Sequence, residues 1–337
     1  MSFVIFFGGK VSISLEELKK VSYLKIDMVD DRAIPMQFCH HPNGEWESWI
    51  DASGTLIKMQ MVDVMDGCYF AKSPAKSTDV HLKFVSLLLK KAYFKDLVHF
   101  ERGIAEDINN LCTSIEKIEL FHEVWLNNPE RINWRFVTTE IEYIFKVCRS
   151  IFDLLQEIVY RIWERFEFLD KTTTKKKLRK SFREMLYKSG ELSTTKEIAE
   201  RFNIPETLAQ FYTQQSEFFV WLRDYRDKIV HGGQNVEHIL ILDEGFAVAI
   251  DQPAFEGLHI WDITEIKNNR LGSLRALLAY ATLNTISAVE QCSTILQQIV
   301  QFPPDIAPEY EVFIRGGNLS VLHDLYTYAE GNEWKKI

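Results

Sequence analysis

The sequence lacks any long apolar run. No stretch of its 337 residues approaches the roughly 18 uncharged apolar residues of a membrane span. The apolar opening at residues 3–7 has no basic residues before it and no small-residue cleavage site after it, so we expect neither a signal peptide nor a membrane anchor. The five cysteines form no CxxC pair, which predicts reduced thiols in a cytoplasmic protein.

Phosphate-loop and metal-hydrolase motifs are missing as well. The chain has no GxxxxGK(S/T) loop and no HExxH helix, so nucleoside-triphosphate enzymes and zinc hydrolases have little support. Cys39, His40 and His41 have no further ligand at the usual spacing, and we interpret them as loop residues rather than metal ligands. The net charge of −9 excludes a generally basic nucleic-acid-binding protein, so any RNA contact requires a local patch.

What is present indicates an α+β fold that is mainly α. Residues 1–80 alternate short β-type runs with turn signals and predict a small β-rich domain. Residues 81–129 have a helical pattern and are interpreted as a connector. We expect an antiparallel helical bundle over residues 130–302, with a β-hairpin insertion, and a C-terminal extension over residues 303–337.

The apolar spacing also predicts individual elements. Long helices are expected at residues 134–169, 205–231 and 271–300, and a hairpin at residues 238–250. A break in the connector is expected near Gly103. The shorter elements are strands at residues 3–7, 23–29, 46–50, 56–65 and 310–314, and helices at residues 178–187 and 319–329.

The helix at residues 205–231 is the one around which we expect the chain to be organised. Its apolar residues recur at steps of three and four, which predicts one buried face. Pro205 suits a first helical turn, and Gly232 with Gly233 can close the helix. The apolar residues of this face are Leu208, Phe211, Phe218, Leu222, Tyr225 and Ile229.

The last turns of this helix carry charged residues and a histidine. Asp227 and His231 are four residues apart and share a face, so the carboxylate can orient the imidazole and raise its pKa. Arg226 lies five residues before His231, which separates the two by roughly 140° on an ideal helix. Both can serve one ligand only if the arginine wraps around the helix or a second copy of the helix contributes.

The run RDKIVH at residues 226–231 resembles the Arg-x4-His signature of the HEPN superfamily (higher eukaryotes and prokaryotes nucleotide-binding domain). The resemblance covers only residues 130–302. It implies a small all-α bundle that pairs into a dimer, and many members are endoribonucleases that need no metal or other cofactor. Carried over by position, it implies that Arg226 and His231 are catalytic, with Asp227 in the variable polar position.

The function expected from this resemblance is RNA cleavage by attack of the 2′-hydroxyl on the adjacent phosphate. His231 would transfer protons, and Arg226 would stabilise charge on the phosphoryl oxygens. The resemblance also implies a toxin or phage-defence setting, in which an antitoxin or a trigger protein is a further partner besides RNA. The alternative is a non-catalytic HEPN-like module that binds nucleotide or RNA or serves as a dimerisation scaffold, in which Arg226 and Asp227 make structural ion pairs.

Two groups of basic residues are candidates for RNA binding. One is the basic run at residues 171–180, which can neutralise phosphates or can simply be a solvated loop and helix start. The other lies beside the apolar stripe of the helix at residues 134–169, where it can face a phosphate-binding cleft or form a solvated edge. The candidates are Lys175, Lys176, Lys177, Arg179 and Lys180 in the first group, and Lys146 and Arg149 in the second.

Overall fold

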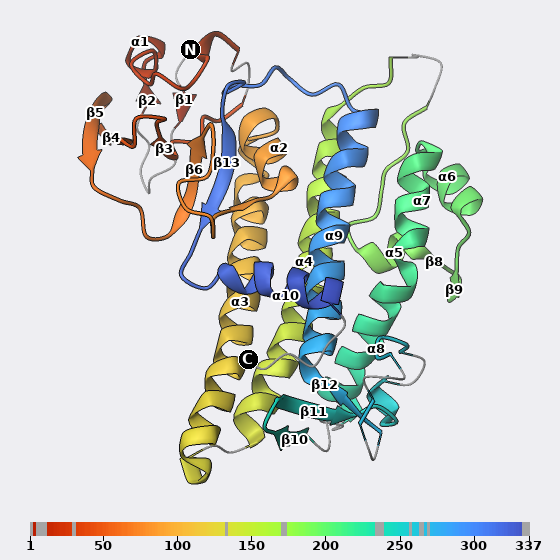
Figure 1. Cartoon of the computed structure of the whole chain (residues 1–337). Helices are drawn as coiled ribbons and strands as arrows, with labels where there is room; N and C mark the ends of the chain where they lie inside the picture. The colour runs from red at the N-terminus through yellow and green to blue at the C-terminus, as the bar shows by residue number, and fades with distance from the viewer. Residues whose placement is uncertain are drawn as a thin grey trace. The chain divides into compact units, whose positions relative to one another are not determined.

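The protein has an α+β structure, rich in helix and containing a mixed sheet (Figure 1). The computed structural model describes residues 3–4, 12–28, 32–131, 134–169, 174–232, 239–255, 258–262, 266–267 and 270–331. In that part of the chain, no helix combines the length and the apolar character needed to cross a membrane.

The chain forms two compact units, each assembled from three stretches of sequence. Unit 1 contains Met1–Ala105, Ile158–Thr173 and Val289–Leu319, and unit 2 contains Glu106–Glu157, Thr174–Ala288 and Ser320–Ile337. The sequence suggested consecutive blocks at residues 1–80, 81–129, 130–302 and 303–337, and these blocks stay predictions. Three long helices contribute residues to both units: α3 (Val98–Asn127), α4 (Trp134–Arg165) and α9 (Leu274–Ile299).

A six-stranded sheet dominates unit 1, with the strand order β5-β4-β3-β6-β13-β7. Only the β3–β6 pair is parallel among these neighbours. Strand β13 comes from the C-terminal part of the chain and lies beside β6 (Figure 1), and it pairs with β7 along its other edge. The bounds are β3 Phe38–His40, β4 Trp46–Ala52, β5 Thr55–Met61, β6 Gly67–Ala71, β7 Val80–His81 and β13 Glu311–Arg315; a separate pair is β1 Phe3–Val4 and β2 Ser12–Ile13.

Arg315 explains why β13 belongs to this sheet. The residue is only 4% exposed, and its guanidinium donates two hydrogen bonds to Asp79, at 2.9 and 2.7 Å, and one to Asp63, at 2.6 Å. The same guanidinium lies over the rings of Trp46 and Tyr69. A buried charge is tolerated when it is paired and hydrogen-bonded in this way, so Arg315 joins β13 to the core of the sheet.

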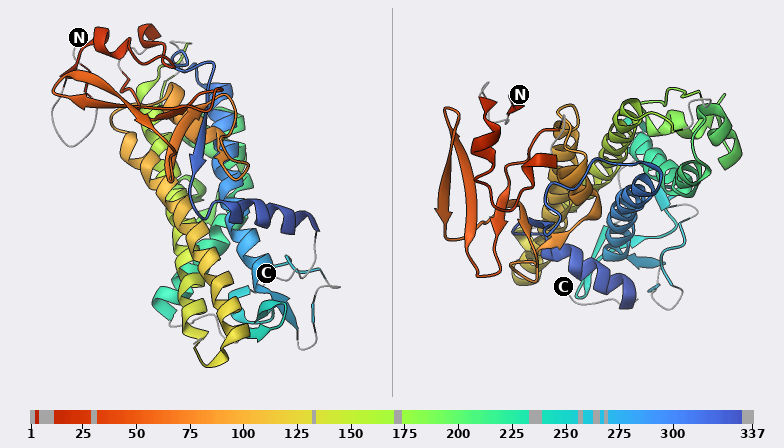
Figure 2. Two further views of the ribbon diagram at one scale, coloured as in Figure 1. Left: turned by 60° about the vertical axis from the view of Figure 1, so that its left-hand side comes forward. Right: turned by 90° about the horizontal axis from the view of Figure 1, so that it is seen from above.

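The short helices of unit 1 are α1 (Leu15–Leu18), the 3₁₀ helix η1 (Ile26–Met28) and α2 (Lys83–Lys91). Ser14 caps α1 by accepting a hydrogen bond from the backbone N–H of Glu17. Helix α2 packs against β13 (Figure 2).

Two sequence predictions in unit 1 are wrong. In place of the strand expected at residues 23–29, the described residues 23–28 form a turn followed by η1, because Tyr23, Leu24 and Ile26 are all buried and their burial does not alternate. The helical break expected near Gly103 lies instead at residues 92–97, between α2 and α3. There Ala92 ends α2 by donating to the carbonyls of Leu87 and Leu88, while Gly103 continues inside α3.

Unit 2 is built from helices around an aromatic core, with a small three-stranded sheet, β10-β11-β12. The predicted hairpin is confirmed as β10 and β11, and β12 adds a third strand to it. The bounds are η2 Pro129–Arg131, α5 Phe182–Leu186, α6 Thr195–Phe202, α7 Glu206–Gln214, α8 Ser216–Gly232, η3 Pro253–Phe255 and α10 Ser320–Gly331, with strands β8 Tyr187–Lys188, β9 Glu191–Leu192, β10 Ile239–Leu242, β11 Gly245–Ala249 and β12 Leu271–Ser273.

The central helix predicted at residues 205–231 is divided into two. Helix α7 ends before Gln215, and α8 begins at Ser216. Thr213 and Ser216 hydroxyls donate to backbone carbonyls at this point, at 3.0 and 2.7 Å, and such bonds compete with the regular helical ladder. The expected helix at residues 178–187 is likewise shorter and is reduced to α5.

Candidate functional site

The end of α8 carries the Arg-x4-His sequence. Leu222 and Tyr225 on this helix are buried, as the apolar spacing predicted. The ring of Tyr225 packs against Phe145 of α4, with 4.2 Å between centroids, and lies parallel to Phe255. These contacts attach the penultimate turns of α8 to the core of unit 2. The side chains of Arg226, His231 and Ile229 lie outside the described residues.

Asp227 is paired with an arginine one turn earlier on α8. Its carboxylate lies 3.5 Å from the Nε of Arg223, and both side chains are partly exposed. Arg223, Asp227 and His231 form an i, i+4, i+8 series along the helix, so these positions follow one side of α8. The structure therefore gives Asp227 an arginine partner that the sequence analysis did not assign to it.

Arg223 also belongs to a group of arginines around Tyr187, which we call the Tyr187 cluster: Arg183, Arg201, Arg223 and Tyr187. The guanidinium carbons of Arg183 and Arg223 lie 5.5 and 5.9 Å from the centroid of the Tyr187 ring. Arg201 donates from Nη1 to the carbonyl oxygen of Tyr187 at 2.9 Å, and from Nη2 to the carbonyl of Met185. Cations from α5, α6 and α8 thus converge on one tyrosine.

The Tyr187 cluster is close to the basic run. Burial lowers the pKa of Arg201, and the neighbouring positive charge of Arg179 lowers it further. Repulsion of this kind requires that the two guanidinium groups be near each other. A negatively charged ligand would relieve it, because an anion between arginines gains charge-assisted hydrogen bonds.

The basic run itself is tied to the body of unit 2. Leu178 is buried, and Gln156 of α4 donates to the carbonyl oxygen of Arg179 at 2.6 Å. Lys176 donates from Nζ to the carbonyl oxygen of Glu200 near the end of α6. Of the other predicted RNA-binding residues of the run, Lys175 is partly exposed, and the remaining three are exposed: Lys177, Arg179 and Lys180.

The two basic candidates on α4 differ in their environments. Arg149 is buried, with its guanidinium 4.4 Å from the ring centroid of Phe219 and an Nη1 2.6 Å from the Asp153 carboxylate. These contacts give Arg149 a packing role inside unit 2. Lys146 is exposed and lies 3.9 Å from Glu142 on the same helix.

Sequence reasoning missed the Tyr187 cluster as a group. Arg201 and Arg223 belong to separate helices, and no local spacing links either of them to Tyr187. The one local signal was the placement of Arg183 and Tyr187 shortly after the basic run. Tertiary packing brings the remaining charges to it.

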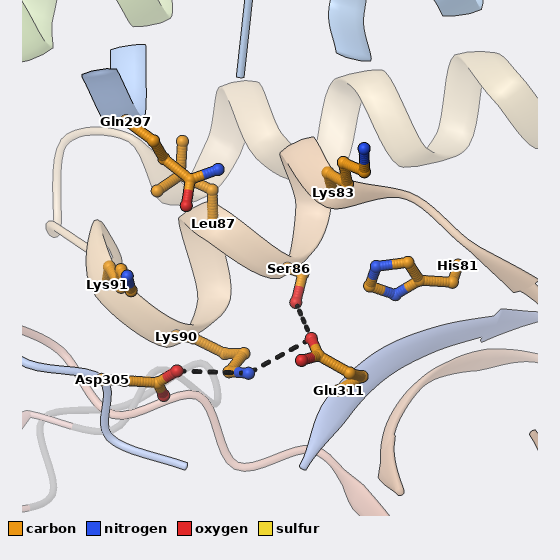
Figure 3. A pocket seen from close by; sticks show the side chains of 9 residues that line it. All are labelled: His81, Lys83, Ser86, Leu87, Lys90, Lys91, Gln297, Asp305 and Glu311. Atoms are coloured by element: carbon orange, nitrogen blue, oxygen red, sulfur yellow. Dashed lines mark hydrogen bonds and ion pairs between the residues drawn. The ribbon is translucent and has the colours of Figure 1, made fainter. Parts of the chain in front are cut away.

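A second candidate site is a cavity of about 290 Å³ in unit 1 (Figure 3). It is lined by α2, by β7, by β13 with the segment before it, and by the end of α9. The lining residues are His81, Lys83, Ser86, Leu87, Lys90, Lys91, Gln297, Asp305 and Glu311.

Comparison with known proteins finds no match for this chain among family models, curated proteins or solved structures. Within the described residues, no group of three or more His, Cys, Asp or Glu side chains is arranged to hold a metal ion.

Proposed function

We propose that the protein is a metal-independent endoribonuclease of the HEPN type, in which Arg226 and His231 act on the RNA phosphate. The observation that carries this proposal is the position of Arg223. It starts the series on α8 that continues through Asp227 to His231, and it also lies over Tyr187. A phosphate backbone bound at the Tyr187 cluster would therefore run beside the helix that bears the Arg-x4-His sequence.

The proposed reaction needs no external nucleophile. The 2′-oxygen of one ribose attacks the adjacent phosphorus, the bond from phosphorus to the 5′-oxygen breaks, and the products are a 2′,3′-cyclic phosphate and a 5′-hydroxyl. His231 accepts the proton from the 2′-hydroxyl or supplies one to the departing 5′-oxygen. Arg226, which is permanently charged and planar, stabilises the negative charge on the phosphoryl oxygens.

A dimer would supply one His231 for each of the two proton transfers. One imidazole cannot be base and acid at the same instant, and Arg226 and His231 are roughly 140° apart on an ideal helix. A two-fold pair of α8 ends would bring two copies of each group to one cleft. The toxin or phage-defence setting, with an antitoxin or trigger protein as partner, is part of the same proposal.

A second candidate function is a non-catalytic RNA-binding or dimerisation scaffold of the same type. The ion pair between Arg223 and Asp227 favours this alternative, because the two side chains then stabilise α8 by pairing with each other and need not act on RNA. This scaffold would bind RNA through the Tyr187 cluster and leave it intact.

Cleavage of single-stranded RNA in excess chelator separates the two functions. We expect wild-type protein to cleave, and His231→Ala and Arg226→Ala each to lower the rate by about 10² or more. Asp227→Asn should lower the cleavage rate less, since it keeps Arg226 and His231 and removes only a charge that neighbours them on the helix. A matched control is His323→Ala, which alters an exposed histidine of α10 and should cleave as wild type does. RNA binding without cleavage by wild type would favour the scaffold.

A further inference from the structure

The polar face of α2 forms one wall of the cavity in unit 1 (Figure 3). Lys83, Leu87 and Lys91 follow one another at steps of four along this face, with Ser86 and Lys90 beside them. The opposite face of α2 is apolar and buried in unit 1, and consists of Phe84, Val85, Leu88 and Leu89. The helix is therefore held by its apolar face and presents a row of polar groups to the cavity.

Lys90 is the central charge of the cavity. Its side chain is only 7% exposed, and its ammonium lies 3.2 Å from Asp305 and 3.2 Å from Glu311 (Figure 3). The Ser86 hydroxyl donates to the same oxygen of Glu311 at 3.0 Å. An ammonium has three N–H donors, and the two carboxylates account for two of them. The third donor is available to a molecule inside the cavity.

Both ends of α2 are fixed by hydrogen bonds. The Glu290 carboxylate accepts the backbone N–H groups of Lys83 and Phe84, at 3.0 and 3.1 Å. At the other end, Nη1 of Arg32 donates to the carbonyl oxygens of Lys90 and Lys91, both at 3.1 Å. The wall is thus preorganised, so a ligand would not have to order it on binding.

The rim of the cavity carries the excess positive charge. The cavity is lined by three lysines, Lys83, Lys90 and Lys91, and by two carboxylates, Asp305 and Glu311, and both carboxylates pair with Lys90. Lys83 and Lys91 make no ion pair with any residue that the structure describes. They lie eight residues apart, about 12 Å along the helix axis.

His81 adds a polar group of defined tautomer. A carbonyl oxygen can only accept, so the contact of 3.0 Å between Nδ1 of His81 and the carbonyl of Val312 requires a proton on Nδ1. In the neutral ring, Nε2 is then an acceptor. The cavity therefore combines cationic donors at Lys83, Lys90 and Lys91 with an acceptor at His81.

We propose that this cavity binds a small organic anion that carries a phosphate or carboxylate group. The anionic group would lie against Lys83 or Lys91, and hydroxyl or further anionic groups would reach Lys90 and Ser86. A volume of about 290 Å³ is close to the lower end of small-molecule sites, which span about 300–1,000 Å³, so the cavity suits a metabolite. The proposal is independent of ribonuclease activity, because every residue involved belongs to unit 1.

Calorimetric titration of the full chain with inorganic phosphate, adenosine 5′-monophosphate and citrate tests this proposal. We expect at least one of the three to bind, and the pattern among them distinguishes phosphate from carboxylate recognition. Lys83→Gln or Lys91→Gln should weaken that binding by about tenfold or more, the scale for losing a hydrogen bond to a charged group. Lys25→Gln is the matched control, since Lys25 is an exposed lysine of unit 1 outside the cavity.

Circular dichroism of each variant checks that the fold is retained, which is expected because Lys83 and Lys91 lie at the rim. Two results would overturn the proposal. One is the absence of binding of all three anions to the wild-type chain. The other is binding that Lys83→Gln and Lys91→Gln leave as strong as in the Lys25→Gln control.

Discussion

Arg223 lies over the ring of Tyr187, with its guanidinium carbon 5.9 Å from the ring centroid. This contact connects α8 with the short strand β8 and thus with the basic run that precedes α5. The charges that could hold an RNA backbone and the helix that carries Arg226 and His231 therefore belong to one part of unit 2.

Arg183→Gln should weaken RNA binding with little effect on chemistry. Arg183 is an exposed member of the Tyr187 cluster and, in contrast to Arg201, makes no bond to the carbonyls of Met185 or Tyr187. The logarithm of the RNA-binding constant falls linearly with the logarithm of the salt concentration, and losing one phosphate contact should make this slope less steep by about 0.7 for single-stranded RNA. Fluorescence anisotropy at several salt concentrations, in a His231→Ala background that prevents cleavage, measures this slope.

The control for that experiment is Lys196→Gln, an exposed lysine of α6 that lies 3.9 Å from Glu200. A slope that Arg183→Gln leaves unchanged, or that Lys196→Gln lowers equally, would contradict a specific role for the Tyr187 cluster.

The protein should form a two-fold dimer. On an ideal helix Arg226 and His231 are roughly 140° apart, so one α8 end cannot present both groups to one phosphate without help. A second copy related by two-fold symmetry supplies the missing group. Light scattering coupled to size exclusion at tens of micromolar should give twice the chain mass, and a monomer throughout would exclude this arrangement.

Tyr225 should tolerate loss of its hydroxyl but not of its ring. The hydroxyl oxygen is buried and has no hydrogen-bond partner among the described residues, and burial raises the pKa of this tyrosine. Tyr225→Phe removes a desolvated polar group and should leave the free energy of unfolding unchanged or raise it by about 1 kcal/mol. Tyr225→Ala should lower the free energy of unfolding by about 3–5 kcal/mol, because it leaves a cavity beside Phe145.

Urea unfolding of the wild type, Tyr225→Phe and Tyr225→Ala measures the free energy of unfolding of each. Destabilisation of Tyr225→Phe by more than about 1 kcal/mol would show that the hydroxyl does have a partner.

Glu101 should make the protein less stable as the pH rises. The residue is 4% exposed, and burial raises the pKa of its carboxyl from 4.5 to about 7. The folded state therefore holds a proton that the unfolded state has lost, and stability falls between pH 4.5 and about 7. The loss from this group is about 3 kcal/mol. Glu101→Gln should remove that part of the pH dependence, which unfolding at pH 5 and pH 8 will measure.

A Glu101→Gln variant with the same loss of stability between pH 5 and pH 8 as the wild type would show that other groups cause it. Glu106→Gln is the matched control, since this exposed glutamate lies on the same helix.

The elements set by local sequence were predictable. The long periodic runs predicted α4 and α9 nearly to their ends, and the Gly-containing turn predicted the hairpin of β10 and β11. In each case the signal lies within a few turns or a few residues of the element itself.

Features that depend on distant residues were not predictable. Strand β13 was expected near residues 310–314, but its place between β6 and β7 depends on Arg315 reaching Asp63 and Asp79, which are more than two hundred residues away. The division of the helix at Gln215 accompanies hydroxyl bonds to the backbone that compete with the regular helical hydrogen bonds. The Tyr187 cluster joins three helices whose arginines are unremarkable in the sequence.

The most direct test of the proposed function uses an otherwise deoxyribose oligonucleotide with one ribose at the cleavage position, incubated with the protein in excess chelator. Cleavage only at that ribose, with a 2′,3′-cyclic phosphate end, is the predicted result, and His231→Ala should abolish it while His323→Ala does not. Cleavage of the all-deoxy strand, cleavage that requires added Mg²⁺, or cleavage that persists in His231→Ala would contradict the account.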